Sequence, residues 1–158
     1  MAEMIVVPNI LITWKEFEQK FQENFGFHCA EMKDIEIYIE KMKAEVEFHQ
    51  LVGWESMEDT EILDECGFAD KSSGELYVIT EISYEEECGP FKIESQNLKD
   101  LVAEHLDLFG ECFFNIDVLI VSFSKKEISI FHHEGVYATL NMLEIQGTKK
   151  LNKDRKSS

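Results

Sequence analysis

Cations are scarce in this sequence. Its 158 residues contain 15 Lys and Arg against 32 Asp and Glu, a formal net charge of −17. Five of those cations lie in the last ten residues, so residues 1–148 hold 31 acids against 10 bases, a net charge of −21. A folded body this acidic repels nucleic acid and anionic lipid and attracts basic partners. The composition therefore argues against nucleic-acid or membrane binding and favours a basic protein partner.

Several functional motifs are also missing. No apolar run approaches the roughly 20 residues that a membrane-spanning helix needs, and residues 1–4 lack the basic region of a secretory signal. The four cysteines are far apart without a CxxC pair, which predicts free thiols in a cytoplasmic protein. The eight glycines stand singly, with no phosphate-binding loop. We therefore expect no cofactor.

Proline is nearly absent, and no linker interrupts the body of the chain. A chain of this length and an apolar content of 44% suit one domain with a sizeable core. We expect a single domain over residues 1–146. The composition changes at Gly147, so residues 147–158 are predicted to form a basic, flexible tail.

Helix signals mark four segments. Thr13 and Glu16 form a capping box, and four aromatic residues follow at helical spacing before Gly26: Trp14, Phe17, Phe21 and Phe25. Residues 34–50 fit both a strand and a helix, and their length favours a helix. A short helix is predicted over 58–65, closed by Gly67. The last helix runs over 97–109, with Ser95 or Asn97 as N-cap, Gly110 as terminator and one apolar face: Leu98, Leu101, Val102, His105, Leu106 and Phe109.

Strand signals dominate the C-terminal half. Residues 75–84 alternate as a strand with one mainly buried face, and Phe91 and Ile93 make a short extended piece. Residues 113–123, 127–132 and 136–142 predict a three-stranded meander, and the strand over 75–84 is a candidate fourth member of the same sheet. The fold class is therefore α+β, an antiparallel sheet of about four strands covered by N-terminal and central helices. We expect the aromatic face of the first helix to pack on these strands, at Val118, Ile120, Ile128 and Ile130.

The most enzyme-like segment is His132-His133-Glu134-Gly135. In a strand, the two histidines point to opposite faces and do not share a metal, and the segment is not the HExxH motif. The structural interpretation is a histidine at a strand end with one ring nitrogen bonded to the backbone. The cysteines have no zinc-site spacing relative to His28, His49 or His105. We therefore predict no catalytic residue and no metal site.

Acidic blocks are the best candidates for a binding surface. They lie where few cations are near to neutralise them, and no calcium-binding loop matches their spacing. Two aromatic residues nearby are potential anchors. The predicted partner-binding residues are Trp54, Glu58, Asp59, Glu61, Asp64, Glu65, Tyr84, Glu85, Glu86 and Glu87.

The general character of the chain resembles the small acidic immunity proteins of bacterial toxin–immunity systems, of the contact-dependent inhibition type. The segment from Phe113-Phe114-Asn115-Ile116-Asp117 through Phe131-His132-His133-Glu134-Gly135 is similar to a strand–hairpin–strand segment of such families. The resemblance implies a non-enzymatic cytoplasmic protein that blocks the basic active site of a nuclease toxin. No binding residue carries over from it.

Two other functions remain open at this stage. The first is an adaptor or scaffold module that binds a basic host protein. The second is an enzyme that uses His132 or His133 together with a carboxylate. A toxin gene directly beside this one favours immunity over the adaptor, and a bound metal favours the enzyme. The sequence does not indicate an oligomeric state.

Overall fold

The computed structural model describes residues 11–25, 47–68, 74–80, 82–83, 89–115, 117–132 and 134–141. Within them the fold is α+β, with one antiparallel sheet in the order β1-β6-β5-β4-β2-β3. The strands are β1 (His49–Gln50), β2 (Glu75–Ile79), β3 (Phe91–Glu94), β4 (Val118–Ser122), β5 (Glu127–Phe131) and β6 (Val136–Asn141). The helices are α2 (Trp14–Phe25), α4 (Asp59–Cys66) and α6 (Leu98–Phe109), with short 3-10 turns η1 (Trp54–Ser56) and η3 (Ser95–Asn97).

The predicted fold class is therefore confirmed, while the sheet has six strands instead of about four. The two additional strands lie at its edges. β1 pairs with β6, and β3 pairs with β2. Both are short, and short strands carry a weak periodic signal in the sequence.

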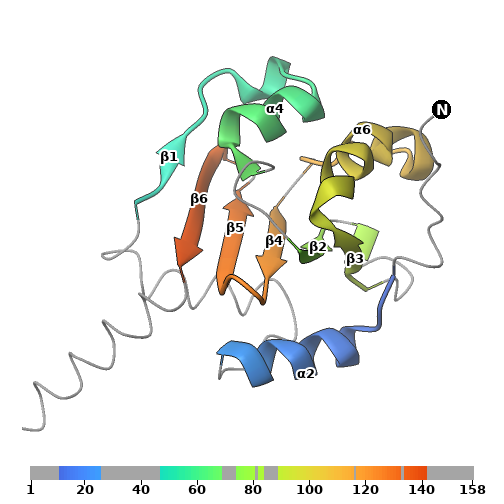
Figure 1. Cartoon of the computed structure of the whole chain (residues 1–158). Helices are drawn as coiled ribbons and strands as arrows, with labels where there is room; N and C mark the ends of the chain where they lie inside the picture. The colour runs from blue at the N-terminus through green and yellow to red at the C-terminus, as the bar shows by residue number, and fades with distance from the viewer. Residues whose placement is uncertain are drawn as a thin grey trace, which may run out of the picture.

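The helices cover both faces of the sheet. Figure 1 shows α2 along one side, with α4 and α6 on the other. A first core cluster packs Phe17, Phe21 and Phe25 of α2 on strand residues Tyr77, Ile79, Leu119, Val121, Ile128, Ile130, Ala138 and Leu140. A second cluster lies on the α4 and α6 side and includes Ile62, Leu63, Leu101, Val102, Leu76, Val78, Val118, Ile120 and Phe131.

The first helix forms as its sequence predicts. The Thr13 Oγ1 accepts a hydrogen bond from the Glu16 N–H at 3.1 Å, which caps an otherwise unpaired amide. Phe17 and Phe21 are fully buried against the sheet. Their predicted contact with Ile128 and Ile130 is confirmed. The contact with Val118 and Ile120 is wrong, because these two side chains alternate with Leu119 and Val121 and face the opposite layer.

The predicted meander is also confirmed, and β2 joins it beside β4. The strand predicted over 75–84 ends at Ile79, with residues 82–83 in a 3-10 turn. Its single buried face is wrong as well, since Leu76 through Ile79 are all buried. The reason is the position of β2 inside a sheet that has a helical layer on both faces.

Two further boundaries differ from the prediction. The strand predicted over 113–123 begins only at Val118, and Phe113 and Phe114 are buried outside the sheet. The helix predicted over 34–50 is wrong at its end, where His49 and Gln50 pair with β6 as β1. Glu47 and Phe48 are not helical either, while residues 34–46 and the predicted tail lie outside the described residues. Cross-strand pairing has therefore overridden the local helical pattern.

The short central helix and the last helix match their predictions closely. α4 ends at Gly67, whose φ of 70° suits a residue without a side chain. α6 ends at Gly110 in the same way. Asn97 occupies the N-cap position of α6, as predicted, but makes no side-chain capping bond, and Ser95 begins η3 instead. Leu106, predicted on the apolar face, is 50% exposed.

None of the helices in the described ranges has both the length and the apolar character that a bilayer crossing requires.

Candidate functional site

The predicted acidic block between residues 55 and 65 forms η1 and α4. Apolar residues Ile62, Leu63 and Cys66 turn one side of α4 into the core. On a helix of 3.6 residues per turn, positions 58, 61, 64 and 65 fall within an arc of about 120° on the opposite side. The helix thus separates its apolar residues from its carboxylates.

Five carboxylates of this segment are exposed, and we call them the acidic surface: Glu55, Glu58, Glu61, Asp64 and Glu65. Residues 44–70 contain no Lys or Arg. Within the described ranges none of the five forms an ion pair. Among the described residues their mutual repulsion is therefore relieved by solvent and salt, and a basic partner would relieve it further.

Trp54 attaches this segment to the sheet. Its ring lies edge-on to Phe131, with ring centroids 5.3 Å apart. A Cβ on Gly135 would come within 2.3 Å of the Trp54 ring, so the indole lies directly on a glycine backbone. The Leu51 N–H also donates to the Gly135 carbonyl at 2.8 Å. Trp54 is half-buried, so its main contacts are internal, although part of its surface stays accessible for the anchoring role predicted from the sequence.

Asp59 is bonded internally as well. Its carboxylate accepts hydrogen bonds from the main-chain N–H of Phe113 at 2.7 Å and of Phe114 at 3.2 Å. These bonds join the first turn of α4 to the segment between α6 and β4, 54 residues along the chain. The position also suits a carboxylate, because the helix dipole is positive there. Asp59 thus differs from its acidic neighbours because its carboxylate is hydrogen-bonded internally. It is not part of the acidic surface.

The other predicted binding residues are not placed. Tyr84, Glu85, Glu86 and Glu87 lie outside the described residues. The structure therefore brings together Trp54 and the acidic residues of η1 and α4, and the second acidic block remains a prediction.

His132 lies at the end of β5, as predicted, with one ring nitrogen bonded to the backbone. Its Nδ1 accepts a hydrogen bond from the Glu134 N–H at 3.3 Å, and its Nε2 lies 4.0 Å from Asp117 Oδ1. His133 lies outside the described residues. Among the residues that are described, no three His, Cys, Asp or Glu side chains are grouped closely enough to hold a metal.

His105 has a role that the sequence does not reveal. Its side chain is buried, with Nδ1 2.7 Å from the Glu111 carbonyl and Nε2 3.4 Å from Thr80 Oγ1. Because a carbonyl only accepts, Nδ1 carries the proton and Nε2 accepts from the Thr80 hydroxyl. Burial lowers the pKa of His105, against the smaller opposing effects of the Glu111 carbonyl and Asp59. Its helical spacing alone indicated a core position but no hydrogen-bond partners.

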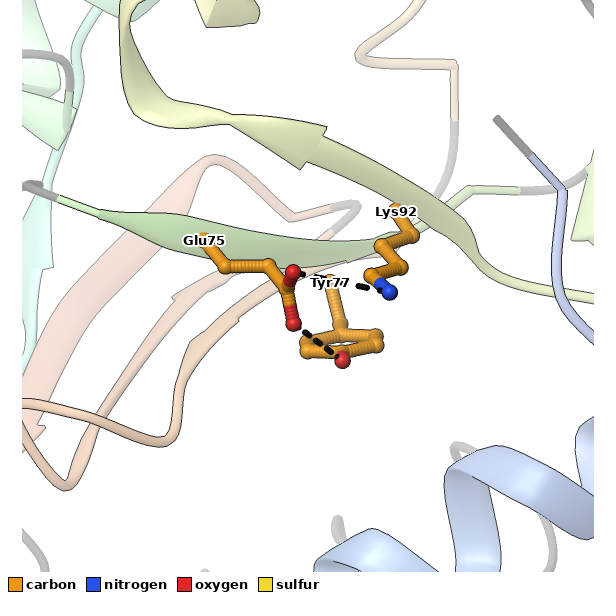
Figure 2. Close-up of polar contacts among 3 residues, drawn as sticks. All are labelled: Glu75, Tyr77 and Lys92. Carbon is orange, nitrogen blue, oxygen red and sulfur yellow. Dashed lines mark hydrogen bonds and ion pairs between the residues drawn. The ribbon is translucent and has the colours of Figure 1, made fainter. Parts of the chain in front are cut away.

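A second polar cluster lies on the α2 side of the sheet. Figure 2 shows the carboxylate of Glu75 in contact with both Tyr77, on the same strand β2, and Lys92, on the paired strand β3. The Tyr77 hydroxyl donates to Glu75 Oε1 at 2.5 Å, and Lys92 Nζ lies 3.5 Å from Glu75 Oε2. Burial, with this hydrogen bond, raises the pKa of Tyr77 well above its ordinary value. Tyr77 therefore stays a neutral donor, and the cluster fastens β3 to β2.

Comparison of the chain with protein-family models, with curated proteins and with solved structures gives no match.

Proposed function

We propose that this protein is a non-enzymatic binding protein that neutralises a basic, nuclease-like toxin by blocking its active site. The acidic surface is the observation that carries the proposal. Five exposed carboxylates without ion-pair partners in the described ranges stand on one short segment, in a chain with a net charge of −17. A nuclease active site is basic because it holds phosphate, and a carboxylate surface can occupy the same positions as that phosphate.

The attachment of the segment supports this role. Trp54 on Gly135 holds the start of η1, and Asp59 on the amides of Phe113 and Phe114 holds the start of α4. A surface that is already ordered loses little conformational freedom on binding. Dense negative charge also accelerates the encounter with a basic partner, by roughly 10–10³-fold at low salt.

Charge reversal on the acidic surface tests the proposal. A variant with Glu61, Asp64 and Glu65 changed to Lys is compared with one in which Glu16, Glu18 and Glu23 of α2 are changed to Lys. Both variants alter the net charge by the same amount, but on opposite layers of the fold. Partners are first captured from the native host with the wild-type chain, and association rates are then measured at several salt concentrations.

The acidic-surface variant should associate far more slowly than the wild type, and the rate of the wild type should fall as salt screens the charges. The α2 variant should lose much less. Equal losses in both variants would mean that net charge alone, and not this surface, governs binding. Inhibition of the captured partner's nuclease activity separates immunity from an adaptor role, because an adaptor leaves its partner active.

The second acidic block is tested separately. Changing Glu85, Glu86 and Glu87 to Lys should slow association more than it lowers the melting temperature, with Tyr84 as the adjacent aromatic anchor. Unchanged binding at low salt would remove this block from the interface and leave the acidic surface as the sole candidate among the predicted residues.

A further inference from the structure

His105 is the centre of a junction between three elements. It lies on α6, its Nδ1 donates to the Glu111 carbonyl just past the end of that helix, and its Nε2 accepts from Thr80 at the end of β2. Three phenylalanine rings surround the imidazole at centroid distances of 4.9–6.4 Å: Phe91, Phe109 and Phe113. The ring is 1% exposed. An imidazolium in this position would lose its hydration without gaining a carboxylate hydrogen bond in return.

The segment after α6 is also bonded to the helix that carries most of the acidic surface. Residues 111–115, which we call the α6–β4 junction, are bonded by His105 at the Glu111 carbonyl and by Asp59 at the amides of Phe113 and Phe114. Asp59 begins α4, the helix that carries most of the acidic surface. A displacement of His105 would therefore reach α4 through three hydrogen bonds of the described residues, in addition to the apolar packing of α4 on α6.

We infer that His105 and Asp59 form a pH-sensitive latch, which fixes α4 to the α6–β4 junction at neutral pH and loosens it in mild acid. The inference rests on the proposed function for its purpose, because loosening α4 would disorder the acidic surface and release the partner. In the neutral ring both nitrogens have suitable partners. Once Nε2 is protonated, the buried charge favours conformations in which the ring leaves its aromatic surroundings and the Glu111 bond breaks.

The charged groups around the ring set the direction of this effect. From α4, the Asp59 carboxylate favours the protonated form; from the junction, the Glu111 carbonyl does the same. Glu104 and Glu111 are close in sequence and each bury one carboxylate oxygen. Burial opposes these groups and is the larger effect, so the pKa of His105 is lowered. The stability that neutral His105 contributes is complete above the ordinary histidine pKa of about 6.5 and is lost as the pH falls below it.

The latch is tested on the full chain without any partner. The ring resonances of His105 are titrated by NMR, and amide hydrogen exchange is followed from pH 7.5 to pH 5.0. His105 should titrate below the ordinary histidine pKa of about 6.5. The protection factors of the Phe113 and Phe114 amides should fall by up to about tenfold per pH unit below 6.5, as one linked proton allows. The amide of Ile130, in the central strand β5, should fall less.

A His105→Asn variant sharpens the test, because Asn keeps an N–H near the position of Nδ1 but does not titrate. In it, the Phe113 and Phe114 protection should no longer depend on pH, while a His49→Asn control should behave as the wild type. The latch is refuted by a His105 titration at or above the ordinary histidine pKa of about 6.5, or by pH-dependent loss that persists in His105→Asn. Equal loss at Ile130 would also refute it, because the whole fold would then be opening.

If His105→Asn does not fold, the wild-type titration and exchange data decide alone. None of these measurements involves a partner, so the latch can fail while the proposed function holds. Conversely, the proposed function fails if reversal of the acidic surface leaves partner binding unchanged, whatever the titration of His105 shows.

Discussion

The two helical layers are held to the same sheet by different means. α2 is held mainly by aromatic packing, with Phe17 and Phe21 fully buried on strand residues, and it has polar bonds to Ser83 and Lys126 near its two ends. α4 and α6 bury apolar residues too, and their polar bonds to the α6–β4 junction come from the titratable side chains of Asp59 and His105. Apolar packing has little pH dependence, whereas hydrogen bonds from titratable groups respond to protonation.

The layers also differ in the charge that they present to solvent. α2 carries Lys15 and Lys20 among its glutamates, and Lys126 donates to the Asn24 carbonyl and side chain near the helix end, at 3.2 Å and 2.7 Å. α4 carries acids alone, and α6 has one lysine. Both layers therefore bury a core, while the acidic surface and the proposed pH-sensitive latch lie together on the α4 and α6 side.

The largest effect is expected from a substitution in the aromatic core between α2 and the sheet. Changing Phe21 to Ala should lower the free energy of unfolding by about 3–5 kcal/mol, because it removes a fully buried ring from tight packing. Glu18→Ala on the same helix should change it by less than about 0.5 kcal/mol. Urea unfolding midpoints measure both. Similar midpoints for the two variants would show that α2 is not packed on the sheet, and its aromatic residues would then become the leading partner surface.

The next effect concerns the attachment of Trp54. Gly135→Ala places a Cβ 2.3 Å from the indole at a φ of 83°, and should cost about 2–4 kcal/mol through overpacking and backbone strain. Gly53→Ala is the matched control, since Gly53 has a similar φ of 78° but nothing within 4 Å of the added atom. It should cost only the strain, about 1–2 kcal/mol. Equal losses would place Trp54 away from Gly135. Tryptophan fluorescence, with Trp14 unchanged, reports the displacement of the ring.

A somewhat smaller effect is expected from the polar attachment of α4. Asp59→Ala leaves the Phe113 and Phe114 amides without their acceptor, and should cost about 2–3 kcal/mol. Glu58→Ala, one residue earlier and exposed, should stay within about 0.5 kcal/mol. Thermal unfolding followed by circular dichroism compares them. If the two losses are alike, Asp59 is one more exposed carboxylate, and the distinction between the two layers is lost.

The smallest effect tests the cap of α2. Thr13→Ala removes the acceptor for the Glu16 amide and should cost about 1 kcal/mol, whereas Thr13→Ser keeps it and should cost less. A loss from Thr13→Ala as large as that from Phe21→Ala would mean that local capping, and not aromatic burial, holds this layer.

Sequence patterns predicted the elements that depend on neighbouring residues. The Thr13 cap, the aromatic stripe of α2, the glycine ends of α4 and α6 and the late meander are all present. Each is encoded within a few residues, by a capping side chain, a helical period or a left-handed glycine. The exposed side of α4 follows from the same period. The sequence therefore predicts most of the candidate site in η1 and α4.

Sequence patterns did not predict contacts between residues that are far apart along the chain. Asp59 resembles its acidic neighbours in every local respect, and only the position of the Phe113 and Phe114 amides, more than 50 residues away, separates it from them. The same holds for Trp54, because its contact with Gly135 depends on the pairing of β1 with β6. The position of His105 on an apolar face predicted burial but not its bonds to Glu111 and Thr80.

The α+β class, the local boundaries of the main helices and the strongly negative charge follow from the sequence alone, because composition and short-range periodicity are properties of neighbouring residues. The tertiary structure decided which strand faces met which helix, why β2 is buried on both sides, and which acidic residue bonds internally while five others stay exposed. The physical reason is that strand order and layer assignment bring distant segments together, and a hydrogen bond or ring contact depends on that placement and not on the residue's neighbours along the chain.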